Sequence, residues 1–142
     1  MTKTKKISLF LLRISFGWIF LYAGISKLTD PSWSAEGFLK SAKTLSGFYE
    51  WLASPANIGW VNFLNEWGLT LIGISLIVGL LVRVSSTAGG VLMLLYYFPS
   101  LHFPYVGKHS LLVDQHIVYL LVFALLFTFQ AGKFWGLDKY LN

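Results

Sequence analysis

The stretch Leu11–Leu28, LLRISFGWIFLYAGISKL, decides the fold class, because it is apolar enough for a membrane span and yet carries two cations. In a helix its charges and glycines fall three or four residues apart, so one face holds Arg13, Gly17, Phe20, Gly24 and Lys27. A charge at the centre of a bilayer costs about 2.5–3.5 kcal/mol even on a lenient insertion scale. We therefore expect this face to look into the protein or a water-filled cavity and to contribute to function.

The composition is that of an integral membrane protein. Of the 142 residues, enough for one domain, 56% are hydrophobic and only 12% are charged, against about 25% charged in soluble proteins. Cysteine is absent, which excludes a disulfide, a thiolate metal site or a thiol relay made by this chain. Beyond Lys3, Lys5 and Lys6 the net charge of +5 forms no basic block. We expect a lipid bilayer as partner and no nucleic acid.

Four segments are candidates to cross a hydrocarbon core of about 30 Å: residues 7–28, 66–82, 84–99 and 112–130. Positive residues concentrate on one side of this arrangement, which predicts a multi-pass protein of the cytoplasmic membrane with both termini in the cytoplasm. The basic start also fits a signal peptide. However, the apolar run is longer than the 7–15 residues expected there and has no small-residue cleavage site, so we predict a retained span.

The loop after the first span predicts an amphipathic helix over residues 34–53. Ser34 can cap this helix, and Glu36 lies in its first turn, where a negative charge is favourable. Its apolar stripe consists of Phe38, Ala42, Leu45, Tyr49 and Leu52. Because the segment is too charged to span, we expect it to lie in the membrane interface. The predicted fold is an all-α, four-transmembrane-helix bundle with one interfacial helix, forming a single domain over residues 1–142.

Four titratable residues form the candidate catalytic group: Lys27, Glu66, Asp114 and His116. Antiparallel neighbouring spans would bring them to one depth near the outer surface. Two carboxylates facing a lysine and a histidine could handle protons or orient an anion. The alternative is that each residue caps a helix end or extends its charge to the headgroups.

Four further residues are candidates for cofactor binding: Arg13, Trp67, Tyr96 and Tyr97. The aromatic residues could line a cofactor pocket or belong to an interfacial belt. Arg13 could extend to cytoplasmic headgroups, or hold a carbonyl or an anionic head at the inner end of the bundle. No acidic residue lies near its expected depth in the membrane.

The three histidines recur every seven residues, at His102, His109 and His116, which suggests haem or metal ligation. Pro104 interrupts any helix that would bring them together, and no acidic or cysteine partner has ligand-like spacing. We therefore expect neither haem nor metal.

Several motifs resemble those of the DoxX family. The first is Arg13, Gly17, Gly24, Lys27 and Leu28, followed by Glu66, Gly73 and Gly79. The tail AGKFWGLD, residues 131–138, is similar to the Gly-rich tail of that family. The long first loop is closer to the DoxD-type relatives. The resemblance implies a four-helix membrane bundle and a link to redox chemistry, since DoxD-type members are the membrane subunit of thiosulfate:quinone oxidoreductase.

Three functions follow as hypotheses. The first is a membrane component of a quinone-linked redox system, with quinone as cofactor and a second oxidoreductase subunit as partner. The second is a non-catalytic scaffold that recruits soluble redox or sulfur-handling enzymes through its basic ends. A small-molecule transporter is the third, although four spans are few and no internal repeat is evident. Packing through the glycine faces would allow a homodimer.

Overall fold

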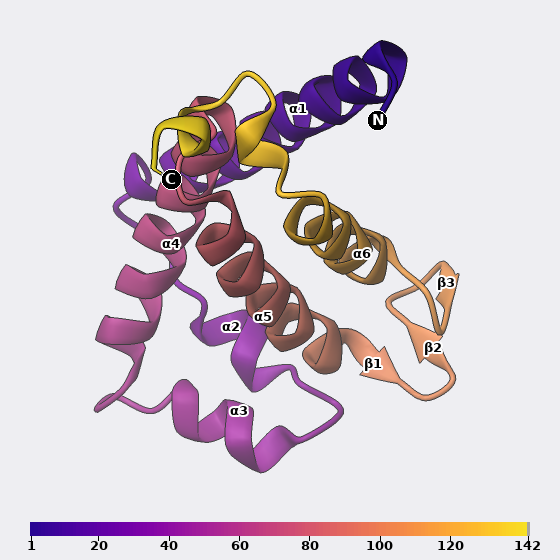
Figure 1. Ribbon diagram of the computed structural model, residues 1–142. Helices are drawn as coiled ribbons and strands as arrows, with labels where there is room; N and C mark the ends of the chain where they lie inside the picture. Colours follow the sequence, from indigo (N-terminus) through magenta and orange to yellow (C-terminus); the bar gives the residue numbers. More distant parts are fainter. Residues whose placement is uncertain (142) are drawn as a thin grey trace.

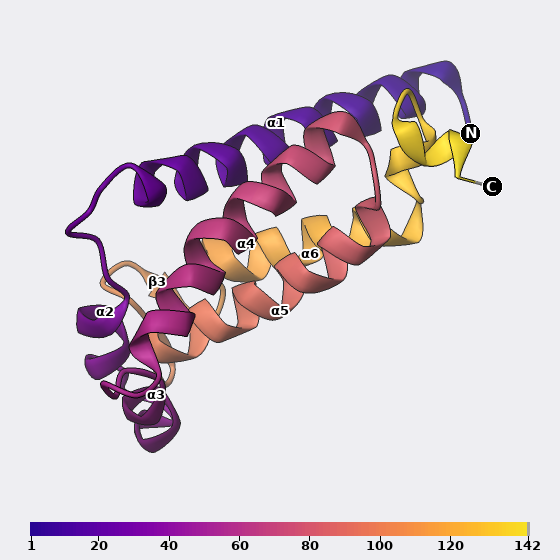
Figure 2. The ribbon, with the colours of Figure 1, turned by 90° about the vertical axis from the view of Figure 1, so that its left-hand side faces the viewer.

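The computed structural model describes residues 1–141. Four long helices form the body of the molecule: α1 (Lys3–Leu28), α4 (Ile58–Val78), α5 (Val82–Ser100) and α6 (Gln115–Thr128) (Figures 1 and 2). By length and composition α1 and α4 can each cross a membrane, and α6 is a shorter apolar helix. The structure is thus mostly helical, as predicted, with two clear membrane-capable helices.

Helices α1 and α4 pack closely where glycines let their backbones meet, between residues 17–24 of α1 and 70–77 of α4 (Figure 2). A Cβ atom added at Gly24 would lie 2.4 Å from the backbone nitrogen of Thr70. One added at Gly73 would lie 2.3 Å from the backbone nitrogen of Leu21. Small residues at the contact are expected where helices associate in lipid without a hydrophobic driving force. These pairings also show that α1 and α4 run antiparallel.

An aromatic core joins α1 to α6 and closes the bundle. Phe123 of α6 lies against Gly89 of α5, where an added Cβ atom would come within 2.1 Å of its ring. The rings of Phe16 and Phe20 meet Phe123 edge-on, with centroids 4.8 and 5.1 Å away. Aromatic pairs at such separations add about 0.5–1.5 kcal/mol beyond their buried area.

The interfacial helix predicted over residues 34–53 is wrong as one element. Two short helices, α2 (Glu36–Lys40) and α3 (Ser46–Leu52), replace it, and Leu45 between them has a left-handed φ of 55°. The break arises because the intervening residues bond to the far end of α5. The backbone nitrogen of Lys43 donates to Pro99, and the hydroxyl of Thr44 donates to the carbonyl oxygen of Leu101.

The break also divides the predicted apolar stripe. Ala42 and Tyr49 are buried, whereas Phe38 and Leu45 are exposed. We call the unit formed by α2, α3 and their connection the cap, because it folds over one end of α4 and α5 (Figures 1 and 2). Its buried residues form a second hydrophobic core together with Val61 of α4.

The remaining segments are short. The loop before α6 folds into a three-stranded antiparallel sheet of β1 (Leu101–His102), β2 (Tyr105–Val106) and β3 (Ser110–Leu111). The tail forms two 3₁₀ turns, η1 (Ala131–Lys133) and η2 (Leu137–Tyr140), beside the end of the bundle opposite the cap (Figure 2). Helix α4 begins eight residues before the predicted span at 66, and the turn into α5 covers residues 79–81, whereas the predicted spans 66–82 and 84–99 leave only residue 83 between them.

Candidate functional site

Arg13 is fully buried, with 0% of its surface exposed. Of the two alternatives for this residue, extension to lipid headgroups is therefore wrong, and contact with a carbonyl is the one observed. One terminal nitrogen, Nη2, donates to the backbone carbonyl of Trp135 at 3.3 Å, and the guanidinium lies 5.4 Å from the ring centre of Phe10. Its Nε and Nη1 atoms find no hydrogen-bond partner within residues 1–141.

Two glycines make the space that the guanidinium occupies. A Cβ atom added at Gly79 would lie 1.8 Å from Nη1 of Arg13, and one added at Gly136 would lie 2.3 Å from the same atom. Gly79 also has a φ of 75°, a left-handed conformation that glycine adopts without steric cost. The backbone is thus packed directly around the charge, with no space for a ligand beside it.

Asp138 completes this arrangement from the tail. Its carboxylate accepts hydrogen bonds from the backbone nitrogens of Leu81 (2.6 Å) and Val82 (3.0 Å), at the start of α5. Its own backbone nitrogen donates to Gly79 at 2.8 Å. Asp138 is also close enough to Arg13 to interact with it electrostatically. We call Arg13, Gly79, Trp135, Gly136 and Asp138 the Arg13 clasp.

Sequence patterns do not connect Asp138 to Arg13, because the two residues are 125 positions apart and Asp138 lies outside the predicted spans. One signal could have found it. Helix α5 starts after Leu81, which cannot cap a helix with its side chain, so a distant acceptor is required at its exposed backbone N–H groups.

Lys27 and Glu66 lie at one level of the α1–α4 contact but are not paired. Lys27 donates to the carbonyl oxygen of Ala23 at 3.5 Å and lies 5.3 Å from the ring centre of Trp33. Within the part of the chain described, the ion pairs are Lys40–Glu36 and His116–Asp114, and neither includes Lys27 or Glu66. The structure therefore does not join the four predicted catalytic residues into one group.

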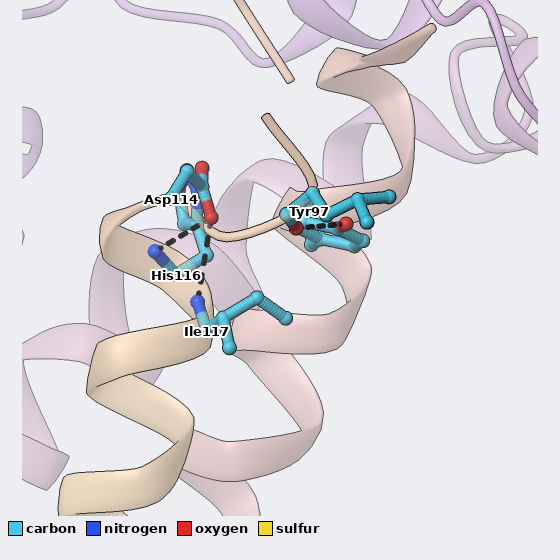
Figure 3. A network of polar contacts seen from close by, with 5 residues as sticks. Tyr97, Asp114, His116 and Ile117 are labelled. Carbon is cyan, nitrogen blue, oxygen red and sulfur yellow. Dashed lines mark hydrogen bonds and ion pairs between the residues drawn. The ribbon is translucent and has the colours of Figure 1, made fainter. Parts of the chain in front are cut away.

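Asp114 and His116 do come together (Figure 3). Oδ2 of Asp114 lies 2.6 Å from Nδ1 of His116, and Oδ1 accepts from the backbone nitrogens of His116 (3.0 Å) and Ile117 (3.3 Å). Asp114 thus caps α6 and orients the imidazole at once. Beside this pair, the hydroxyl of Tyr97 donates to the carbonyl oxygen of Leu112 and fixes the entry into α6 (Figure 3).

Tyr96 lies between this pair and α4. Its ring meets the His116 imidazole edge-on at 6.0 Å, and its hydroxyl donates to Oδ1 of Asn65. Asn65 is buried, and its amide nitrogen donates to the carbonyl oxygen of Val61 at 2.9 Å. Asn65 was not among the predicted site residues. Trp67 is a predicted cofactor-binding residue, but its side chain is 43% exposed on the outside of α4.

A cavity of about 250 Å³ opens beside the Asn65–Tyr96 pair, between the cap, α4 and α5. We call it the cap pocket. Six of its lining residues are aromatic and the rest, apart from Asn65, are aliphatic. The aromatic residues are Phe38, Phe48, Tyr49, Trp51, Trp60 and Tyr96. Apolar walls with a few convergent polar groups are typical of small-molecule sites.

The polar groups of the cap pocket retain unused hydrogen-bonding capacity. An asparagine amide carries two N–H donors and a phenol oxygen can accept as well as donate. In the part of the molecule described, one Asn65 donor is used by Val61, and Tyr96 uses its hydroxyl as a donor. Tyr49 is already engaged with the carbonyl oxygen of Leu95 at 2.8 Å, and burial raises its pKa to about 12, so it remains a protonated donor.

Comparison with known proteins places this geometry in a family. The model of the DoxX family matches residues 8–101, more than half of the chain. The chain belongs to the DoxX family. No curated protein and no solved structure matches it.

The DoxX match runs from residue 8 within α1 to just past the end of α5 and includes every residue that lines the cap pocket, whereas α6 and the tail lie beyond it. Asp138, His116 and Asp114 are therefore outside the matched residues. Membership in this membrane-associated family, together with the two membrane-capable helices, identifies a membrane protein.

Proposed function

We propose that this DoxX protein is the membrane component of a quinone-linked redox system and that the quinone ring binds in the cap pocket. The observation that carries the proposal is an aromatic cavity lined by the buried Asn65 and the partly buried Tyr96, whose polar groups have spare hydrogen-bonding capacity. A flat ring stacks on aromatic side chains. A carbonyl on that ring can accept from the free amide hydrogen of Asn65.

The chain itself supplies binding and proton positions rather than electrons. A bound quinone would take up two electrons and two protons to become a quinol, with a reduced sulfur compound such as thiosulfate as the electron donor through a second subunit. Tyr96 can accept a hydrogen bond from the quinol hydroxyl while it holds Asn65. The partly exposed Asp114–His116 pair, whose imidazole contacts the Tyr96 ring edge-on, would exchange protons with the surface.

We also propose that all four long helices cross the membrane, with both termini in the cytoplasm and the cap outside. The positions of the positive residues support this orientation. Because the chain has no cysteine, single cysteines report the topology directly. In intact cells a membrane-impermeant maleimide should label Ser46→Cys in the cap, and should label Thr4→Cys only after permeabilisation. The reverse pattern would overturn the orientation.

Ring binding is tested on the purified, lipid-reconstituted protein with a tail-less benzoquinone. The readout is quenching of tryptophan fluorescence, to which Trp51 and Trp60 in the pocket wall contribute. The wild type should show saturable quenching. Asn65→Leu should weaken binding about tenfold. The hydrogen bond to the quinone carbonyl contributes about 1 kcal/mol, and burying that carbonyl without a donor adds a further cost. Gln115→Leu, an exposed polar-to-apolar change on α6, is the matched control and should bind as the wild type does.

Two outcomes would contradict the proposal. The first is quenching that does not saturate in the wild type, and the second is equal affinity in Asn65→Leu. In membranes supplied with the partner subunit, thiosulfate-dependent quinone reduction should fall in Asn65→Leu by the same factor as binding.

The packing of the tail favours this proposal over a scaffold that recruits enzymes through its C-terminal end. Gly132 and Gly136 are buried, and Asp138 is committed to the start of α5. The tail is therefore held against the bundle by its glycines and by Asp138, rather than extending from it as a free segment.

A further inference from the structure

The cap pocket is too small for a whole membrane quinone. At about 250 Å³ its volume is below the range for small-ligand sites, about 300–1,000 Å³, and suits a ring without a long substituent. An isoprenoid chain attached to the ring must therefore leave the pocket along another surface of the protein.

A long apolar groove between α4 and α5 adjoins the cap pocket. Its volume is about 750 Å³, and it shares two walls with the cap pocket, Leu64 and Leu92. From Leu64 to Val78 it follows α4 for about 21 Å at 1.5 Å per residue. The groove then ends at Leu80 and Leu81, beside the Arg13 clasp.

The groove offers no polar group to a ligand. Two serines line it, and the remaining residues are aliphatic or glycine. The hydroxyls of Ser75 and Ser85 lie 2.7 Å apart, and Ser85 also donates to the carbonyl oxygen of Leu81 at 3.1 Å. Gly68 and Ala88 keep the groove open, since their side chains occupy little of it. Such a surface fits a hydrocarbon chain.

We propose that the α4–α5 groove binds the isoprenoid tail of the quinone whose ring occupies the cap pocket. The inference rests on the proposed function and deepens it. A chain joined to a ring in the pocket reaches the groove as an intramolecular ligand, so its effective concentration is high. It is therefore favoured over the acyl chains of the surrounding lipid. The groove selects quinones by the length of their tail.

The test compares two quinones with the same ring, one without a tail and one with a long isoprenoid tail, in nanodiscs at equal quinone-to-lipid ratios. The wild type should bind the long-tailed quinone at least tenfold more tightly. Ala88→Leu fills the groove and should reduce this advantage below threefold, while leaving the affinity for the tail-less quinone unchanged. Ser15→Leu places the same side chain at an exposed position of α1 outside the groove and should keep the full advantage.

Gly68→Ala provides a second variant in case Ala88→Leu does not fold. A Cβ atom added at Gly68 would have Leu92 at 3.9 Å as its nearest neighbour, so the change is tolerated sterically and narrows the groove. In Gly68→Ala the ratio of the two affinities, for the long-tailed and the tail-less quinone, should be about one third of the wild-type ratio.

The outcomes separate the two proposals. Failure of both quinones to bind overturns the proposed function and the groove with it. Binding of the tail-less quinone without a gain from the tail, or with a gain that Ala88→Leu retains, overturns the groove alone. Competition by a fatty acid of equal chain length, as effective as the long-tailed quinone, would assign the groove to lipid and overturn the proposal.

Discussion

The two ends of the bundle differ in what surrounds their polar side chains. At the Arg13 clasp a full charge is enclosed by glycine backbone, a carbonyl and the nearby Asp138, and the space around it is filled. At the cap end the polar groups of Asn65 and Tyr96 are neutral and adjoin a cavity. The most conspicuous charge in the sequence is thus enclosed by the fold, whereas two uncharged residues provide the candidate binding site.

Gly79→Ala should produce the largest effect and would test whether the clasp is as tightly packed as its geometry indicates. The added methyl meets Arg13 at 1.8 Å and the backbone of Gly136 at 2.5 Å, at a left-handed φ. We expect the free energy of unfolding to fall by about 2–5 kcal/mol, since overpacking costs about 1–3 kcal/mol and left-handed strain about 1–2 kcal/mol. Denaturant titration in mixed micelles measures it.

Gly59→Ala is the control for this change. Nothing lies within 4 Å of a Cβ atom added there, so the free energy of unfolding should change by less than about 0.5 kcal/mol. Equal effects at Gly79 and Gly59 would show that the clasp is loose.

Arg13→Met should have an intermediate effect on stability and none on the binding site. Asp138 would keep its two bonds to the start of α5, and the main loss is the hydrogen bond to Trp135. We expect unfolding to become easier by about 1–2 kcal/mol. The affinity for a tail-less benzoquinone, measured per folded molecule, should not change. A tenfold loss of that affinity would show that Arg13 contributes to the cofactor site, and it would contradict the proposed difference between the two ends.

Tyr49→Phe should have the smallest effect and a distinct pH dependence. The pKa of Tyr49 is raised from 10.0 to about 12, so the folded state favours the protonated phenol that donates to Leu95. Its stabilisation is complete below about pH 10 and is lost as the pH rises through 12. At pH 8 the wild type should therefore exceed Tyr49→Phe by about 1 kcal/mol.

The measurement is the difference in free energy of unfolding between the wild type and Tyr49→Phe at a series of pH values. A difference that stays constant from pH 8 to 12 would show that the phenol is not held in its protonated form by the cap.

Hydropathy and spacing predicted much of the helical framework. Long apolar runs form helices wherever the backbone must satisfy its own hydrogen bonds, so α1 and α4 follow from local sequence. The glycine-bearing face of the first span also packs inward as predicted, because a buried charge and close backbone contact both require it. The cap was less predictable, since its break depends on bonds from Lys43 and Thr44 to the end of α5.

The sequence by itself determined that this chain is a helical membrane protein and that the face of Arg13 is turned inward. Only the tertiary structure decided what that face contacts and where a ligand fits. Asp138 reaches the clasp from the far end of the chain, and the cap pocket combines residues of α2, α3, α4 and α5. Local periodicity indicates which side of a helix is buried. It carries no information about which distant backbone or side-chain group contacts that side.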